Sequence, residues 1–558
     1  MSLQTFRERA NLFLYGHKEQ LLGIIKYLNL IVTAIAVFTL VYYYGYQHNA
    51  EEKIMLLKII KGSFAFYVVH YLIRFIYDWH PAQFLKSTWF EGAMMLVLTV
   101  EAIAYNLFDV LLLEKLFQSL GFTGITDLSA VFIQCYFLAI ILIGFGKSTN
   151  AIPRFKINPA LIFILTFLTI ILIGTGLLML PEMTNIEGNL NFIDALFSST
   201  SAACVTGLMT LNTHVDFTFK GQMILLILMK LGGLNIIAFG SFLALAARFG
   251  IDVKQHSVIE DFVNKESSLS ATGMFRKVII WSLGIEVAGT IGMFIFWDQA
   301  IPFASTSEKF FYSIFHAVSA FNNAGISIFD GGLYGEIVRN NYYVHWIINI
   351  LVFLGALGMM AVFDLFDPQN LRNRLLNPWK RISFGTKIAL YYSIGLIAAG
   401  AGLYLIFEND GTLSGMTTFG KVTTAVFQSV NTRSNGFNSV DYGMISLPTT
   451  FIFIMLMFIG ASSSSTGGGI KTSTLALLFA SALATIRGHE NTELFRRTIS
   501  SSLLTRAVTV FLFFVVVNVV GVVVLSITEQ QLLVGNQFTG TDLLFETVSA
   551  FGNVGLST

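Results

Sequence analysis

The sequence predicts an all-α polytopic membrane protein with four parallel membrane–pore-loop–membrane repeats around one central pore, preceded by extra transmembrane helices. Composition is the first observation: of 558 residues, 54% are hydrophobic and 12% are charged, against about 25% charged in a typical soluble domain. The second is a series of apolar segments of about 20 residues, the length that crosses the hydrocarbon core of a bilayer. The third is a short semi-polar motif that occurs four times between long apolar segments.

Charge and motif content exclude several classes of function. The chain carries 34 Lys and Arg against 33 Asp and Glu, a net charge of +1, so nucleic acid is not an expected partner. Its nine histidines are dispersed, and the sequence has no H-E-x-x-H motif, so we do not expect an enzyme. The N-terminus lacks a small-residue cleavage site, which predicts a retained first helix and a cytoplasmic N-terminus.

Residues 1–150 are expected to form an N-terminal module of four transmembrane helices. The apolar segments of this module cover residues 20–45, 54–77, 92–116 and 128–146. The fourth segment has no ladder of arginines, so we do not expect a voltage sensor. We interpret the module as serving packing or assembly.

Long apolar segments divide the remaining chain into repeats. They lie near residues 159–180, 220–248, 276–298, 343–366, 386–408, 450–484 and 503–528. Together with the short motifs between them, they predict pore repeats at residues 151–250, 251–372, 373–488 and 489–558. The fourth repeat stops at Thr558, just past its motif, so we expect that the chain is incomplete there or that something else supplies this wall of the pore.

The short motif has a regular spacing in all four copies. The copies read DALFSSTSAACVTGLMT (194–210), YSIFHAVSAFNNAGISI (312–328), TAVFQSVNTRSNGFNSV (424–440) and DLLFETVSAFGNVGLST (542–558). Each has a Phe, a small polar residue four positions later and then a glycine, which is ten residues after the Phe in three copies and nine in the third. The four glycines are Gly207, Gly325, Gly436 and Gly555. Such a repeat is hard to obtain by chance and predicts four equivalent segments.

The distribution of positive charge predicts that the repeats run in parallel. Lys and Arg concentrate in the linkers between repeats, at residues 147–156, 248–277, 372–387 and 487–506. The stretches that hold the motifs carry only Lys220, Lys309, Arg339, Lys421 and Arg433. Because basic loops favour the cytoplasmic side, every short segment enters the membrane from the opposite face. Inverted repeats would alternate their basic loops instead.

The motif favours cation binding. Half-helices that enter from outside direct their C-terminal dipole ends, which carry partial negative charge, at the membrane centre. Glycine reaches positive φ without a steric penalty, so main-chain carbonyls can turn toward one axis and replace the water of a potassium ion. We predict a potassium filter from four glycine turns, whose residues are Val205, Thr206, Gly207, Asn323, Ala324, Gly325, Ser434, Asn435, Gly436, Asn553, Val554 and Gly555. Interhelical loops that bind no ion are the alternative, which a shared spacing and a shared membrane side disfavour.

The stretch FIGASSSSTGGGIKTST (458–474) interrupts an apolar segment with four serines and three consecutive glycines. We call residues 461–471 the serine–glycine loop. Non-helical backbone at membrane depth is tolerated only where it lines water or is buried in protein. Serine hydroxyls can bond the backbone groups that the break frees, and glycines lower the cost of changing conformation.

Several stretches resemble one known superfamily. They are KLGGLNIIAFG (230–240), FLGALGMMAVFDL (353–365), QSVNTRSNGFNSVD (428–441) and MFIGASSSSTGGGIKT (457–472). The chain resembles, over roughly residues 150–558, the bacterial Trk and Ktr potassium-translocating subunits (TrkH and KtrB), which are related to the plant and fungal HKT and Trk transporters. The resemblance implies four membrane–pore–membrane repeats, a homodimer in the lipid of the cytoplasmic (inner) membrane, and a cytosolic TrkA- or KtrA-like ring that binds the nucleotide. Known relatives carry no extra N-terminal helices or about two, whereas four are expected here.

The resemblance also assigns roles to residues. The family's filter glycines match the four motif glycines, and Gly207 favours potassium because plant relatives with serine there transport sodium. The serine–glycine loop matches a loop that obstructs the pore, which makes its members gate residues: Ser463, Ser464, Ser465, Thr466, Gly467, Gly468, Gly469 and Lys471. Lys471 is either an electrostatic brake on cations or a side chain that reaches the inner interface from a passive kink. Arg433 is expected to brace the filter from behind through carbonyls or an acid.

Two functions follow from these expectations. The first is potassium uptake through a gated channel-like pore under the control of the cytosolic partner. The second is a secondary transporter that couples potassium to sodium or proton movement and needs a further ion site. A membrane-embedded enzyme ranks below both.

Overall fold

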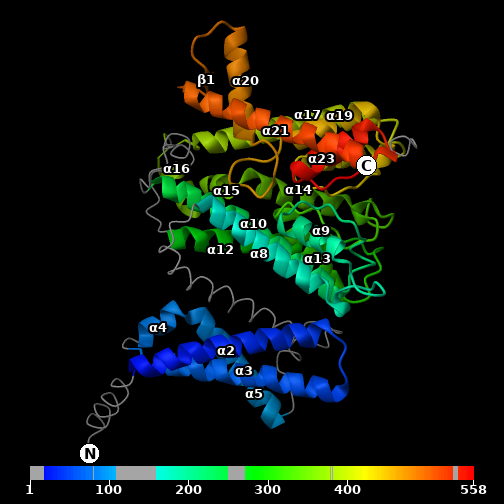
Figure 1. Cartoon of the computed structure of the whole chain (residues 1–558). Coiled ribbons are helices and arrows are strands. Elements are labelled where there is room, and N and C mark those ends of the chain that lie inside the picture. The colour runs from blue at the N-terminus through cyan, green and yellow to red at the C-terminus, as the bar shows by residue number, and fades with distance from the viewer. Residues whose placement is uncertain are drawn as a thin grey trace, which may run out of the picture. The chain divides into compact units, whose positions relative to one another are not determined.

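The computed structural model describes residues 18–78, 81–108, 159–248, 271–377, 379, 381–531 and 538–558. Figure 1 shows their arrangement as helices with one small hairpin. Contacts divide the chain into two compact units, each of which is described by itself. Unit 1 comprises Met1–Ile157 with the short segments Leu180–Glu182 and Ala304–Ser307, and unit 2 comprises the rest.

Unit 1 contains α2 (Lys18–Gly45), α3 (Ala50–Ile76), α4 (Pro81–Ser87) and α5 (Trp89–Phe108). Helix α3 has two acidic residues in its first turn and Arg74 in its last, as the helix dipole favours. Arg74 pairs with Glu91 of α5 at 2.8 Å, and Tyr67, Tyr71 and Met95 belong to a shared apolar core. The third expected segment, 92–116, corresponds to α5 as far as Phe108, and the fourth, 128–146, lies outside the described residues.

Unit 2 contains long helices that alternate with short ones. The first two repeats hold α8 (Pro159–Leu178), α9 (Phe192–Ala203), α10 (Phe219–Arg248), α12 (Ala271–Phe296), α13 (Thr306–Phe321), α14 (Tyr342–Leu357) and α15 (Met359–Phe366). The next two hold α17 (Phe384–Glu408), α18 (Thr418–Thr432), α19 (Leu447–Phe458), α20 (Thr472–Ile486), α21 (Ser501–Thr528) and α23 (Gly540–Phe551). The connections include α16 (Pro368–Leu376) and the 3-10 turns η3 (Gly332–Tyr334) and η4 (Tyr442–Met444). A further 3-10 turn, η2 (Pro181–Met183), begins in the segment Leu180–Glu182, which belongs to unit 1. This fold class, an all-α polytopic membrane protein, is the one that the sequence predicts.

One antiparallel hairpin follows α20. Its strands β1 (Glu493–Leu494) and β2 (Arg497–Thr498) pair Glu493 with Thr498 and Leu494 with Arg497. Helix α20 and β1 project from the rest of unit 2 (Figure 1).

Six helices in the described part of the chain are long and apolar enough to cross a membrane. They are Gly23–Gly45, Ala50–Ile76, Phe219–Ile237, Arg276–Phe296, Phe384–Glu408 and Ser501–Thr528. Helix α21 shows the expected lipid-facing character, because Phe513, Val516 and Val520 are all more than half exposed. Helices α9, α13, α18 and α23 have 12, 16, 15 and 12 residues, which is too short to cross the hydrocarbon core.

The segment 343–366, expected as one span, is broken. Helices α14 and α15 meet at Gly358 with a bend of 106°. Gly358 has φ 86°, which glycine adopts without strain. Its position lies against the backbone of Ser463 and Ser464, so the bend makes room for the serine–glycine loop.

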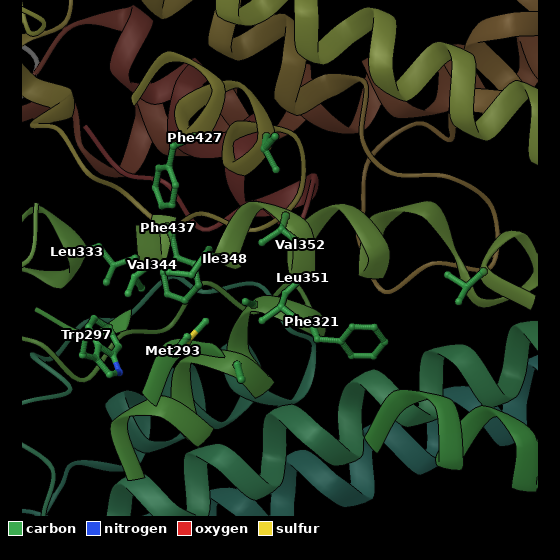
Figure 2. Close-up of a cluster of buried hydrophobic side chains, with 14 of the residues drawn as sticks. Met293, Trp297, Phe321, Leu333, Val344, Ile348, Leu351, Val352, Phe427 and Phe437 are labelled. Atoms are coloured by element: carbon green, nitrogen blue, oxygen red, sulfur yellow. The ribbon is translucent and has the colours of Figure 1, made fainter. Parts of the chain in front are cut away.

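The largest buried apolar cluster joins the second and third repeats. Figure 2 shows Phe321 at the end of α13, Ile348 and Val352 on α14, and Phe427 on α18 within it. All four side chains are at most 2% exposed. This packing holds α13 and α18 against α14 and positions the turns that follow α13 and α18.

Candidate functional site

The four glycine turns come together in one ring. Each glycine lies against the carbonyl oxygen of the residue that precedes the next glycine in the ring. These close approaches join Gly207 to Ala324, Gly325 to Asn435, Gly436 to Val554 and Gly555 to Thr206. The last approach returns to the first turn, so the ring is closed. A Cβ at any of the four positions would collide with main-chain oxygen.

Backbone conformation explains why glycine occupies these positions. The φ angles of Gly207, Gly325, Gly436 and Gly555 are 93°, 67°, 80° and 90°. An L-residue there would be strained as well as crowded. In the sequence each glycine follows a Phe by nine or ten residues, and the structure brings all four glycine turns to one place.

The local fold of each turn starts at the end of a short helix. In the first, second and fourth turns, Val205, Asn323 and Asn553 have φ between 51° and 58°. The next N–H donates back into the helix, as in the bond from Ala324 N to Ser319 O at 2.8 Å. In the third turn, Gly436 N donates to Asn431 O at 3.1 Å, and residues 433–435 all have negative φ. The third turn therefore lacks the non-glycine residue with positive φ that the other three turns contain. This difference of one residue accounts for its Phe-to-Gly spacing of nine instead of ten.

The small polar residue of each motif supports the turn, a role that sequence reasoning did not assign. Ser319 Oγ donates to Ile326 O at 2.8 Å and Ser549 Oγ donates to Leu556 O at 2.6 Å. Ser201 Oγ accepts from the Gly207 N–H at 3.0 Å. In the third motif, Asn431 Oδ1 accepts from the Asn435 amide at 2.9 Å. The sequence signal for this role was the position that these residues share, four residues after the Phe.

An open cavity of about 720 Å³ adjoins the ring. It is lined by all four glycines, and its walls include Asp441, Tyr442 and Glu546. Burial raises the pKa of the Tyr442 phenol, which keeps it a neutral donor to Gln428 Oε1 of α18. A cavity of this volume has room for a hydrated ion, and carboxylates in its wall would attract cations.

The serine–glycine loop lies directly against three glycine turns. A Cβ on Gly467 would meet the Ser434 side chain, and one on Gly468 would meet the Gly552 carbonyl. The Asn323 amide oxygen accepts from Thr466 Oγ1 at 2.9 Å. The break between α19 and α20 therefore places loop atoms in contact with the second, third and fourth turns.

Internal hydrogen bonds hold the loop together. Ala461 N donates to Gly468 O at 3.1 Å and Ser465 Oγ donates to Ser462 O at 2.5 Å. Ser463 Oγ also bonds Ser473 Oγ, in the first turn of α20, at 3.0 Å. The half-buried Lys471 donates from Nζ to Gly467 O at 2.6 Å. Serine and lysine thus satisfy backbone groups that the interrupted helix leaves free. The lysine is held by its own loop, and its role as a brake or as an interfacial side chain stays a prediction.

The break at Gly358 is bonded to this loop. Met359 N donates to Ser464 O at 3.3 Å, and Ser462 N donates to Ala356 O at 2.9 Å. Two interrupted helices from consecutive repeats thus satisfy each other's backbone. Sequence reasoning missed this partner, although Gly358 lies in a stretch, FLGALGMMAVFDL, that it had singled out.

Arg433 lies behind the third turn, fully surrounded by protein. It is 3% exposed, and its guanidinium donates to Gly460 O at 2.9 Å and to Ser393 O at 3.4 Å. In the described ranges, no ion pair joins Arg433 to a carboxylate. Of the two expected kinds of contact, carbonyls and an acid, it makes the first. Its role as a filter brace stays a prediction.

Comparisons with known proteins place this arrangement in a family. Residues 128–558 match the TrkH family, described as cation transport protein. The Ktr system potassium uptake protein B of Bacillus subtilis is 32% identical over 74% of this chain and 88% of that protein. The potassium/sodium uptake protein NtpJ of Enterococcus hirae is 32% identical over 72% of this chain and 86% of that protein.

A solved structure has the same fold. The potassium transporter TrkH from Vibrio parahaemolyticus matches with a TM-score of 0.54 and 16% identity, over 85% of this chain and 89% of that one. With the family match over most of the sequence, the conclusion is that this chain belongs to the TrkH family of cation transport proteins.

Proposed function

We propose that this chain takes up potassium across the cytoplasmic membrane through the ring of glycine turns. The closed ring of four glycines, each against the carbonyl oxygen of the next turn, is the observation that supports the proposal most directly. Main-chain oxygens gathered in this way replace the hydration shell of a potassium ion. The relatives in Bacillus subtilis and Vibrio alginolyticus are named potassium uptake proteins, which favours potassium as the transported ion.

The short helices add to this selectivity. Their C-terminal ends precede the glycine turns directly, as α13 ends at Phe321 and α18 at Thr432. Partial negative charge at a helix C-terminus stabilises a cation nearby. The filter is therefore formed by residues 205–207, 323–325, 434–436 and 553–555, with the open cavity on its outer side.

The serine–glycine loop is the gate in this proposal. It contacts the filter through Thr466, Gly467 and Gly468, so an ion leaving the filter meets it next. Glycines at three consecutive positions let the loop change conformation at low cost. The gate comprises residues 463–469 and Lys471, and Arg433 braces the filter from behind while bonding the carbonyl of Gly460, next to the loop.

A regulatory partner and a second copy belong to the same proposal. Two relatives are named as components of Ktr systems, which favours partner subunits. We assign control of the gate to a cytosolic TrkA- or KtrA-like ring that binds the nucleotide, and the working unit to a homodimer. The basic linkers favour a cytoplasmic N-terminus and cytoplasmic inter-repeat loops, and we assign packing or assembly to residues 1–150.

Coupled transport is the second candidate. The Enterococcus hirae relative is named a potassium/sodium uptake protein, so sodium can be the coupling ion. Flux measurements in vesicles separate the two mechanisms. Passive flux reverses at the potassium equilibrium potential, whereas coupled flux shifts its reversal when the sodium or proton gradient changes.

Substituting a filter glycine tests the proposal. Gly325→Asp or Gly436→Asp places a side chain where the structure has a carbonyl oxygen, so we expect loss of rubidium uptake in cells without their own potassium import. Gly415→Asp is the matched control, because Gly415 also has a positive φ of 76° but has open space around it. Wild-type uptake in both filter variants, at normal membrane levels, would contradict the proposed path.

A further inference from the structure

A buried ion pair lies behind the second glycine turn. Lys230 of α10 donates from Nζ to both carboxylate oxygens of Glu286 of α12, at 2.7 and 2.8 Å. Lys230 Nζ also donates to Ser282 Oγ at 2.6 Å. The two charged side chains are 19% and 6% exposed. Both residues lie within helices long enough to cross the membrane.

This pair is unusual on energetic grounds. Removing two charges from water costs several kcal/mol for each ion, and their attraction often only balances that cost. Ionisable residues within membrane helices are accordingly functional candidates. Neither side chain lines the outer cavity or the serine–glycine loop, so the transport path leaves the pair unexplained.

Glu286 connects the pair to the filter through one side chain. Asn322 Nδ2 donates to Glu286 Oε1 at 2.9 Å and to Val318 O at 2.8 Å. Asn322 is the residue directly before Asn323, where the backbone enters the second turn with φ 58°. Fixing the Asn322 side chain therefore fixes the point at which α13 ends and the glycine turn begins.

Helix α10 is shaped to fit this contact. A Cβ on Gly233 would collide with Asn322 Oδ1, and one on Gly232 would collide with the Ala203 carbonyl at the end of α9. The two glycines let α10 approach the ends of two short helices. Lys230, one turn earlier on α10, then reaches Glu286 behind the second of these ends.

We infer that Glu286 is a positioning residue for ion selectivity: it holds Asn322 and thereby the second glycine turn, while Lys230 orients the carboxylate. This inference rests on the proposed function of the ring as a filter. The third turn has a comparable device, because the buried Arg433 bonds carbonyls behind it. Buried charged side chains thus hold the second and third glycine turns in place through hydrogen bonds.

Rubidium kinetics and sodium competition in cells without their own potassium import test the inference. Glu286→Leu and Asn322→Ala each remove the hydrogen bond. We expect about a tenfold rise in the rubidium KM, the size of one charge-assisted hydrogen bond, with weaker discrimination against sodium and a nearly unchanged maximal rate. Glu286→Gln keeps an oxygen acceptor for Asn322 and should restore most of the wild-type KM. The double variant Glu286→Leu/Asn322→Ala should have a rubidium KM no higher than that of either single variant, because both substitutions remove the same contact.

Arg374→Gln is the matched control. Arg374 pairs with Asp364 at 2.7 Å, with exposures of 21% and 7%, close to those of Lys230 and Glu286. Asp364 also accepts from the Ser383 N–H, and no hydrogen bond in the described ranges joins this pair to a glycine turn. We expect an unchanged KM in Arg374→Gln.

Three outcomes overturn the inference. The first is a wild-type rubidium KM and wild-type discrimination against sodium in Asn322→Ala at normal membrane levels. The second is a rise in the KM of Arg374→Gln as large as that of Asn322→Ala. The third is a KM in the double variant that reflects the sum of the two single effects. If Glu286→Leu fails to reach the membrane, the rubidium KM values of Asn322→Ala and Glu286→Gln are sufficient to test the inference. Retained uptake in Gly325→Asp would instead contradict the filter itself, so the two failures are distinguishable.

Discussion

Thr466 donates a hydrogen bond of 2.9 Å to the amide oxygen of Asn323. The first residue belongs to the break in the third repeat and the second to the glycine turn of the second repeat. The same Asn323 oxygen accepts from the Ala356 N–H at 3.2 Å, just before the bend at Gly358. One amide thus joins a glycine turn, the serine–glycine loop and the second interrupted helix, so a movement of the loop reaches this turn without an intermediate.

Removing this hydrogen bond should loosen the loop. A neutral hydrogen bond contributes about 1 kcal/mol, which corresponds to roughly a fivefold change in an equilibrium. We expect Thr466→Ala to raise rubidium flux several-fold when the cytosolic partner is inactive or absent. Thr466→Ser keeps the hydroxyl and serves as the control. Equal fluxes in Thr466→Ala and wild type would show that this contact does not restrain the gate.

Shortening the loop is a stronger test of the same element. Deletion of residues 464–469 removes the atoms that contact Asn323, Ser434 and Gly552. We expect a higher rubidium flux that depends less on the cytosolic partner. The measurement is uptake with and without that partner at matched membrane levels. A deletion variant that remains fully regulated would count against the gate.

Arg433 tests whether the filter needs support from behind. Arg433→Met leaves the carbonyl of Gly460 buried without this donor, and an unsatisfied buried group costs about 1–3 kcal/mol. We expect at least a tenfold loss of rubidium uptake and a higher sodium-to-rubidium ratio. Arg433→Lys keeps the charge but loses the planar fork, so partial activity is expected. Wild-type uptake and selectivity in Arg433→Met would show that Arg433 does not brace the filter.

The sequence predicted those parts of the fold that depend on local pattern. Apolar length identified the long helices of unit 2, and the Phe-to-Gly spacing identified four turns that the structure brings into one ring. The serine–glycine loop was recognisable because polar residues and glycines interrupt an apolar run. In each case the signal lies within some 20 consecutive residues, where periodicity and turn chemistry act.

The parts that were missed depend on contacts between distant segments. The run FLGALGMMAVFDL is apolar on both sides of Gly358, so hydropathy reports its length and not its bend of 106°. The bend depends on Ser462 and Ser464 of the next repeat, which bond its free backbone groups. Likewise, Lys230 and Glu286 stand in separate apolar helices, and neither local pattern identifies the other as its partner. Arg433 was singled out, but only the fold shows that it reaches the carbonyl of Ser393 on α17 and that of Gly460 after α19.

Glu408 offers a test of stability apart from transport. Its buried carboxylate, at the end of α17, accepts from the Ser446 N–H at 2.8 Å, from Thr449 Oγ1 at 2.7 Å, and from the N–H and hydroxyl of Thr412 at 3.2 and 3.0 Å. It therefore ties the end of α17 to the start of α19, the two helices between which the α18 motif is inserted. The N-terminal dipole of α19 also favours a negative charge at this point.

In Glu408→Gln, an NH₂ group replaces one of the two carboxylate oxygens. This group faces N–H and O–H donors from which the oxygen accepted, so at least one hydrogen bond becomes a repulsive contact. We expect a loss of about 1–3 kcal/mol in stability, measured as a lower unfolding temperature of the purified protein in detergent. Asp410→Asn is the matched control, because Asp410 is exposed two residues further along and should leave the temperature unchanged. Equal unfolding temperatures in the two variants would mean that the Glu408 network does not hold these helices together. A lower temperature in Glu408→Gln alone would locate the stabilising contact at the C-terminal end of α17.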